Sequence, residues 1–161
     1  MSLQVDIHKK LGAFTLDVAL EASVEKPEVL GLLGASGCGK SYTLKCIAGI
    51  ETPDKGRIVL DGETLFDSEK GVNLPPQMRR VGYLFQNYAL FPNMTVRQNI
   101  LCGLRWEKNK QAREEELQRV LALLRLEGLE KHRPYQLSGG QAQRVALGRI
   151  LVNRPRLLML D

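Results

Sequence analysis

Hydrophobic residues alternate with polar ones near the start of the chain, with the two-residue period of a half-buried β-strand. Leu3, Val5 and Ile7 form one such series. A second series follows, at Phe14, Leu16, Val18, Leu20 and Ala22. The pattern therefore predicts two strands, paired antiparallel, at the beginning of the fold.

An apolar run without alternation comes next, at residues 29–33. Continuous hydrophobicity is typical of a strand that is buried on both faces, so we predict a buried strand here. Beyond a glycine-rich turn, the apolar positions between Lys40 and Ala48 have helical spacing, and Gly49 is a helix stop signal. The predicted order is therefore buried strand, glycine-rich turn and helix.

The remainder of the chain predicts further strands and a helical region. Residues 57–60 and 81–85 are typical of short strands, and the texture becomes helical across residues 96–152. An apolar run at residues 157–160 then leads to Asp161, the last residue. Alternation of strands and helices predicts an α/β fold.

Composition indicates a folded domain. The chain has 161 residues, of which 43% are hydrophobic, and this is enough for the core of a single domain. No apolar stretch approaches the roughly 18 residues of a membrane span, and residues 1–10 lack the apolar stretch of a secretory signal. The three cysteines contain no C-x-x-C pair, which argues against a disulfide framework and a zinc site. We therefore expect a cytoplasmic protein.

A phosphate-binding pattern, G-x-x-x-x-G-K-[ST], is matched by Gly34, Ala35, Ser36, Gly37, Cys38, Gly39, Lys40 and Ser41. Glycines let a loop wrap closely round phosphates, so that backbone N–H groups and the positive end of a helix face the anion. Lys40 would reach the β- and γ-phosphates, and the Ser41 hydroxyl would bind Mg²⁺. The alternative is a glycine turn that caps a helix beside an idle lysine. The position between a strand and a helix favours the phosphate site.

A second constellation consists of Ser138, Gly139, Gly140 and Gln141. Ser138 and Gln141 have the spacing of a capping box, which is the simpler interpretation. However, each glycine in a first helical turn costs about 1 kcal/mol relative to alanine, and a cap alone does not need them. Bare backbone at a helix N-terminus is a second candidate anion site.

These motifs, with Gln86 after one predicted strand and Asp161 after another, resemble the nucleotide-binding subunit of an ATP-binding cassette (ABC) transporter. The resemblance covers essentially the whole chain, and LSGGQ beside a phosphate-binding loop is highly specific. The segment at residues 73–93 looks most like importer subunits, and the segments at residues 11–16 and 60–71 are similar to the molybdate-type oxyanion importers.

The resemblance implies a P-loop NTPase core with an N-terminal antiparallel β layer and a helical signature subdomain, incomplete at the C-terminus. Residues 1–161 would be one ATP-binding domain. Residues 1–86 would form the β layer and the P-loop core, 87–152 the helical subdomain with the signature, and 153–161 the Walker B strand.

Roles for individual residues also follow from the resemblance. The P-loop would hold ATP, with Tyr42 standing where the family usually has a small hydroxyl residue near the α-phosphate. Gln86 and Asp161 would be the catalytic Q-loop glutamine and Walker B carboxylate, and with Ser41 they would bind Mg²⁺. Phe14 is the candidate that stacks on adenine. It is also in register to be a core residue, and spacing to the P-loop favours Leu11 instead.

Two partners are implied. A second nucleotide-binding subunit would pair head to tail, so that the signature of one subunit closes over the γ-phosphate held by the other. The segment that begins at Tyr88 and ends at Pro92 would receive the membrane permease subunits, which would hold the chain at the inner face of the cell membrane. Ordinary core packing of Leu90 and Phe91 is the alternative for this segment.

Nucleic acid is not an expected partner, although 23 Lys and Arg against 18 Asp and Glu give a net charge of +5. The basic residues are spread along the chain. ATP-binding heads of DNA-repair proteins also contain long coiled coils, and the residues between Gln86 and Ser138 show no sustained heptads.

The chain departs from the family pattern after Asp161, where the catalytic glutamate and the switch histidine are expected. From the sequence we expect a truncated chain that binds Mg-ATP and hydrolyses it poorly. The leading function is therefore the energy-coupling ATPase of an importer for molybdate or a related oxyanion. The alternative is a nucleotide-binding module without significant hydrolysis.

Overall fold

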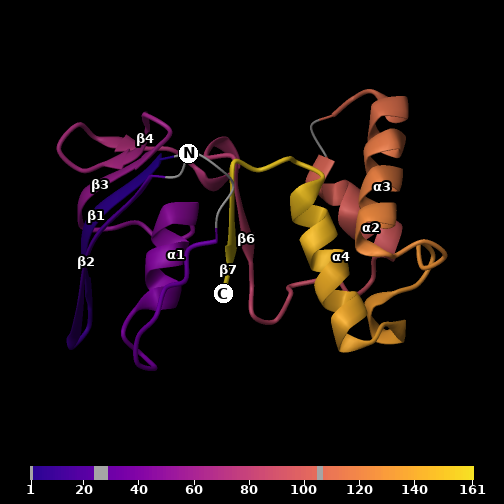
Figure 1. Ribbon diagram of the computed structural model, residues 1–161, viewed down its shortest axis with the longest axis horizontal. Helices are drawn as coiled ribbons and strands as arrows, with labels where there is room; N and C mark the ends of the chain where they lie inside the picture. The colour runs from indigo at the N-terminus through magenta and orange to yellow at the C-terminus, as the bar shows by residue number, and fades with distance from the viewer. Residues whose placement is uncertain (1, 24–28, 105–106) are drawn as a thin grey trace. The chain divides into compact units, whose positions relative to one another are not determined.

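The computed structural model describes residues 2–23, 29–104 and 107–161, which fall into two compact units that divide between Arg79 and Arg80 (Figure 1). Within these residues, the first unit contains a five-stranded sheet and the helix α1. The second contains the helices α2, α3 and α4 and a two-stranded sheet. The α/β class is therefore confirmed, while the subdivision at residues 86 and 152 stays a prediction.

An antiparallel sheet of order β2-β1-β3-β4-β5 organises the first unit. Its first two strands confirm the predicted hairpin, because β1 (Ser2–Leu11) and β2 (Phe14–Ser23) pair antiparallel. The other strands are β3 (Lys55–Leu60), β4 (Glu63–Asp67) and β5 (Val72–Asn73). Alternate residues of β1, β2 and β3 lie on one face and are buried, at Leu3, Val5, Ile7, Leu16, Ile58 and Leu60.

The helix α1 (Lys40–Ala48) has the predicted bounds. It ends because Gly49 adopts the left-handed conformation, with φ 77°. The fully buried guanidinium of Arg79 donates hydrogen bonds to two carbonyl oxygens of the last turn, Cys46 at 2.7 Å and Ile47 at 3.0 Å. A positive charge also interacts favourably with the negative end of the helix dipole, so Arg79 stabilises the C-terminus of α1.

The strand predicted at residues 29–33 is wrong for this structure. These residues form no strand, and Val29 and Leu33 are 100% and 96% exposed. A strand needs a neighbour that completes its backbone hydrogen bonds, and the sheet of the first unit does not include this segment. The segment is apolar, as its sequence shows, but it is not buried.

The second unit begins with β6 (Val81–Leu84), which pairs in parallel with β7 (Leu157–Leu160). Both strands were predicted, although β7 is only partly buried and Leu160 is 62% exposed. The helices are α2 (Val96–Leu101), α3 (Lys110–Leu124) and α4 (Gly139–Leu151). Short 3₁₀ turns are present at Pro76–Met78 in the first unit and at Cys102–Leu104 and Pro134–Gln136 in the second.

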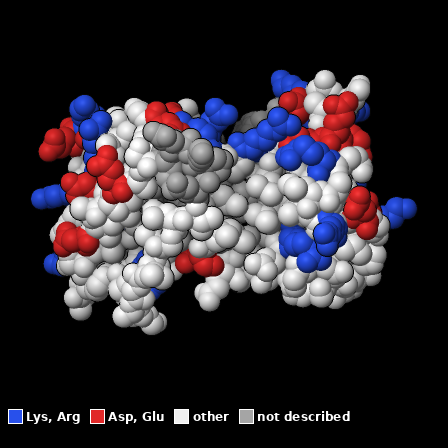
Figure 2. Space-filling model, viewed as in Figure 1, with Lys and Arg blue, Asp and Glu red and all other residues white. Residues whose placement is uncertain are grey.

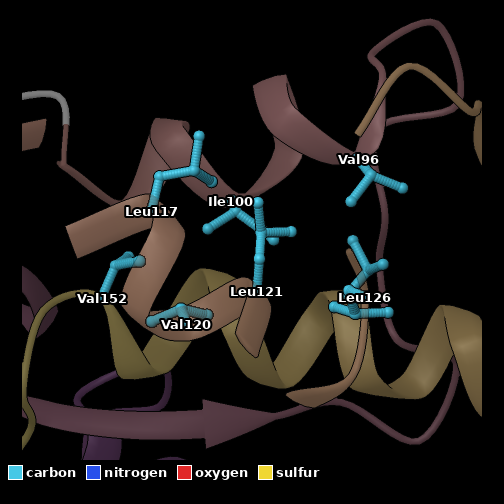
Figure 3. Close-up of a cluster of buried hydrophobic side chains, with 8 residues drawn as sticks. Val96, Ile100, Leu117, Val120, Leu121, Leu126 and Val152 are labelled. Atoms are coloured by element: carbon cyan, nitrogen blue, oxygen red, sulfur yellow. The ribbon is translucent and has the colours of Figure 1, made fainter. Parts of the chain in front are cut away.

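A hydrophobic core joins the three helices of the second unit (Figure 3). It consists of Val96, Ile100, Leu117, Val120, Leu121, Leu126, Val145 and Val152. Gly148 of α4 faces this core, and a Cβ there would lie 3.1 Å from Val120 and 3.3 Å from Ile100. The glycine therefore lets α4 approach its neighbours closely, which explains why a weak helix former occupies the position.

Charged side chains of both signs are mixed on the face shown in Figure 2, and neither sign forms a continuous surface there. Across residues 2–23, 29–104 and 107–161, no helix is long and apolar enough to cross a membrane.

Candidate functional site

The glycine-rich loop folds around the side chain of Lys40, the first residue of α1. The Lys40 Nζ donates hydrogen bonds to the backbone oxygens of Gly34 at 2.8 Å and Ala35 at 2.7 Å, and it lies 3.6 Å from the Cys38 Sγ. The ammonium thus sits inside the loop that precedes it. An anion held by the loop would meet this charge directly.

Local backbone conformation explains the glycines. Gly37 and Gly39 have φ of 80° and 97°, which side chains rarely tolerate. A Cβ on Gly39 would also lie 2.4 Å from the Leu16 Cδ1, because the start of α1 lies against β2. Glycine is therefore required at Gly39 by both conformation and space.

The N-terminus of α1 fits an anionic ligand. The N-cap residue is Gly39, which has no side chain to cap this end, and the first turn carries no acidic residue. The positive end of the helix dipole at this N-terminus therefore favours a phosphate. Ser41, the hydroxyl-bearing last position of the motif, lies in the same turn and is partly exposed.

Phe14 lies beside this loop. Its ring atoms Cε1 and Cζ are 3.5 and 3.6 Å from the point where a Cβ on Gly39 would stand, and the residue is 40% exposed. The core alternative for Phe14 is therefore wrong. Leu11 is its cross-strand partner in the β1–β2 hairpin, so both candidates for the adenine contact lie at the same end of the hairpin.

Tyr42 interacts with a neighbouring cation. It is 37% exposed, and the Lys45 Nζ lies 5.4 Å from the centre of its ring. A cation over an aromatic face is a favourable arrangement. Ser36 and Cys38 are exposed on the loop.

In the second unit, Gln86 and Asp161 follow the parallel strands β6 and β7. The carboxyl ends of parallel strands meet at one edge of a sheet, so both residues lie at that edge. The Asp161 N–H donates to the Leu84 oxygen at 3.2 Å, which continues the ladder to the carboxylate-bearing residue. Gln86 is exposed.

Tyr83 contacts the candidate site residue Asp161, although the sequence pattern did not single it out. Its hydroxyl donates a hydrogen bond of 2.6 Å to the Asp161 Oδ2. Burial, and then the hydrogen bond and charge of Asp161, raise the pKa of this hydroxyl. The two residues are 78 positions apart, and the parallel pairing of β6 with β7 brings them together.

The capping box at the start of α4 is confirmed. The Ser138 Oγ accepts from the Gln141 N–H at 3.2 Å, and the Gln141 Oε1 accepts from the Ser138 N–H at 2.8 Å. Packing does not explain the glycines between them. In the described part of the chain, a Cβ on Gly139 would meet no atom within 4 Å, and one on Gly140 would meet only the end of Arg144 at 3.8 Å. Because these two residues have no side chains, they leave the backbone at the N-terminus of α4 uncovered on its outer side.

The segment at residues 88–92 is partly core and partly surface. Leu90 packs against the hydrophobic core of the second unit, whereas Phe91 is 46% exposed. Tyr88 and Ala89 have positive φ of 60° and 43°, and Arg149 of α4 holds both of their carbonyl oxygens. The core alternative therefore applies to Leu90 and not to Phe91.

Comparison with known proteins identifies this arrangement. The sequence profile of the ABC transporter family matches residues 19–161. The molybdenum import ATP-binding protein ModC of Paramagnetospirillum magneticum is 44% identical over 99% of this chain and 43% of its own length. The spermidine/putrescine import ATP-binding protein PotA of Methylococcus capsulatus is 52% identical over 83% of this chain and 34% of its own length.

A solved structure agrees with these sequences. The ATP-binding cassette MJ0796, a dimer in a post-hydrolysis state bound to ADP and Pi, matches with a TM-score of 0.78 and 28% identity, over 100% of this chain and 73% of that one. The chain spans less than half the length of the two curated relatives. The family match covers most of the chain, and the chain belongs to the ABC transporter family.

Proposed function

We propose that the chain is the ATP-binding, energy-coupling part of an ABC importer subunit. The observation that carries the proposal is the loop at the start of α1, where Lys40 is enclosed by the glycine-rich backbone and the N-cap residue is a glycine. Backbone donors, a helix dipole and one ammonium are the groups that bind the phosphates of a nucleotide.

ATP and Mg²⁺ are the proposed ligands. Mg²⁺ prefers oxygen ligands, and the candidate set consists of a hydroxyl (Ser41), an amide (Gln86) and a carboxylate (Asp161). When bound, the ion would offset phosphate charge. Lys40 would exchange its bonds to loop carbonyls for bonds to the phosphates, and Phe14 would stack on the base.

A second copy of the subunit is the proposed partner at the signature. Ser138, Gly139, Gly140 and Gln141 would face the nucleotide held by the P-loop of the other subunit. The bare surface over Gly139 and Gly140 supports this role, because packing within the described chain gives no reason for either glycine. The dimeric state of MJ0796 agrees with such an assembly.

Membrane permease subunits are the proposed partners of the segment at residues 88–92. Its exposed Phe91 and its rigid hold by Arg149 suit a docking surface at the inner face of a membrane. We propose no nucleic-acid partner.

The proposed cargo is molybdate or a related oxyanion. ModC relatives match 99–100% of the chain at 42–44% identity, while PotA relatives, which are named for polyamines, match 83–97% of it at 46–52% identity. Uptake of labelled molybdate and labelled putrescine would be compared in cells whose own gene carries Lys40→Ala. Loss of molybdate uptake alone supports an oxyanion importer, and loss of putrescine uptake alone would replace it with a polyamine importer.

Phosphate release from ATP tests whether the chain itself hydrolyses nucleotide. Steady release that disappears with Lys40→Ala supports the ATPase. Nucleotide binding without release above the Lys40→Ala background supports the non-hydrolysing module instead.

A further inference from the structure

Tyr83 and Asp161 lie on the same face of the two-stranded sheet. The register pairs Tyr83 with Met159 of β7, and alternate residues of a strand share a face, so Asp161 lies on the Tyr83 side. A tyrosine side chain is long enough to reach the position diagonally opposite. The Tyr83 hydroxyl does so, with 2.6 Å between its oxygen and the Asp161 Oδ2.

The donor in this pair is held rigidly. Tyr83 is 9% exposed, and its ring packs edge to face with Phe85, with 4.8 Å between the ring centres. Its own strand, β6, packs directly on α4, because a Cβ on the neighbouring Gly82 would be 2.3 Å from the Ile150 Cγ2. The hydroxyl therefore has little freedom to move away from the carboxylate.

The acceptor is held through both its backbone and its side chain. The Asp161 backbone N–H continues the ladder to Leu84, and its side chain accepts from Tyr83. Hydrogen-bond partners that orient a metal-binding carboxylate contribute to metal affinity even though they do not touch the ion.

We propose that Tyr83 is a positioning residue, which holds the Asp161 carboxylate in the orientation that binds the Mg²⁺ of Mg-ATP. The inference rests on the proposed function of the chain as a nucleotide-binding domain. The Tyr83 hydroxyl would orient the Asp161 carboxylate, and Tyr83 belongs to neither the P-loop nor the signature.

Tyr83→Phe tests the inference because it removes one oxygen atom and keeps the ring that packs on Phe85. ATP affinity would be measured by calorimetry with Mg²⁺ and with a chelator, and the ratio of the two dissociation constants gives the gain from the metal. Electron paramagnetic resonance of Mn²⁺ added with ATP would measure bound metal independently. Tyr135→Phe is the matched control, since Tyr135 lies in the same unit and is 77% exposed.

We expect Tyr83→Phe to lower the gain in ATP affinity that Mg²⁺ provides by about tenfold and to leave the ATP affinity without metal unchanged. In Tyr135→Phe, both quantities should equal those of the wild type. The double variant with Asp161→Asn should bind Mg-ATP no more weakly than Asp161→Asn alone, because Tyr83 acts through that carboxylate. An unchanged metal gain in a folded Tyr83→Phe protein, or additive losses in the double variant, overturns the inference and leaves the proposed function intact. Failure of the wild-type chain to bind ATP overturns both.

Discussion

The guanidinium of Arg149 donates a hydrogen bond of 2.8 Å to the backbone oxygen of Ala89, a residue 60 positions earlier. It also donates to the Tyr88 oxygen at 3.1 Å and lies 5.2 Å from the centre of the Phe91 ring. Tyr88 and Ala89 have positive φ, and each such residue costs about 1–3 kcal/mol unless its surroundings enforce the conformation. A single side chain of α4 therefore maintains a strained turn at the surface.

Replacing Arg149 should loosen this turn without unfolding the second unit. Hydrogen bonds to a charged donor contribute about 1.5–3 kcal/mol, so Arg149→Met should speed amide exchange at Tyr88 and Ala89 by about tenfold or more. Arg144→Met, at an exposed position of the same helix, is the control. Equal exchange in both variants would contradict the role given to Arg149.

A second prediction concerns the end of α1. Gly49 and Gly62 have nearly the same φ, 77° and 78°, but a Cβ at Gly49 would lie 2.5 Å from the Arg79 Nε and one at Gly62 would meet no described atom within 4 Å. Gly62→Ala should therefore cost about 1 kcal/mol of unfolding free energy, from backbone strain. Gly49→Ala adds a clash with the buried guanidinium and should cost about 3 kcal/mol. Urea denaturation measures both, and similar losses would show that Arg79 does not fill this space tightly.

Local features of the fold were accessible from the sequence. Helix α1 begins and ends where predicted, because Gly39 and Gly49 mark its boundaries by backbone conformation. The capping box at Ser138 depends on two residues in one helical turn, so its spacing alone predicts its hydrogen bonds. The β1–β2 hairpin follows from alternation in adjacent segments.

Features that depend on distant partners were not accessible. The sequence pattern places Tyr83 among the apolar residues of a short strand. Its hydroxyl meets the Asp161 carboxylate only because β6 pairs with β7 in this register. Arg79 stands next to Arg80 with no local pattern that signals burial, yet it is fully buried against α1. The apolar run at residues 29–33 predicted burial, but burial of a strand requires neighbours that no local pattern supplies.

Acid should weaken the second unit through Glu116. Hydrogen bonds from Arg119 and then Arg154 lower the pKa of this carboxyl from 4.5 to about 2. The folded state therefore favours the ionised form, and its contribution is present above pH 4.5 and is lost as the pH falls from 4.5 toward 2.

Glu116→Gln should accordingly lower the urea midpoint at neutral pH, by a margin that shrinks as the pH approaches 2. Glu127→Gln removes an exposed carboxylate of the same unit and is the control. Helical circular dichroism reports the midpoint. A difference between wild type and Glu116→Gln that stays constant with pH would rule out this linkage.

Nucleotide should protect Cys38 from alkylation. Cys38 is exposed on the P-loop, Cys46 is buried, and burial raises the pKa of Cys46 to about 11 and also raises that of Cys102. Iodoacetamide at neutral pH should therefore label Cys38 first, and saturating Mg-ATP should slow that labelling while leaving the other two unchanged. Peptide mass spectrometry gives the rates, and equal labelling of Cys38 with and without nucleotide would place the ligand elsewhere.

Mg-ATP binding to the purified chain, measured by calorimetry beside Lys40→Ala, tests the central claim most directly. The wild-type chain should bind Mg-ATP, and Lys40→Ala should lose that binding while it keeps the circular dichroism spectrum of the folded protein, because Lys40 supplies the ammonium enclosed by the loop. Absence of binding by the folded wild-type chain, or equal binding by both proteins, would contradict the claim that this loop is the nucleotide site.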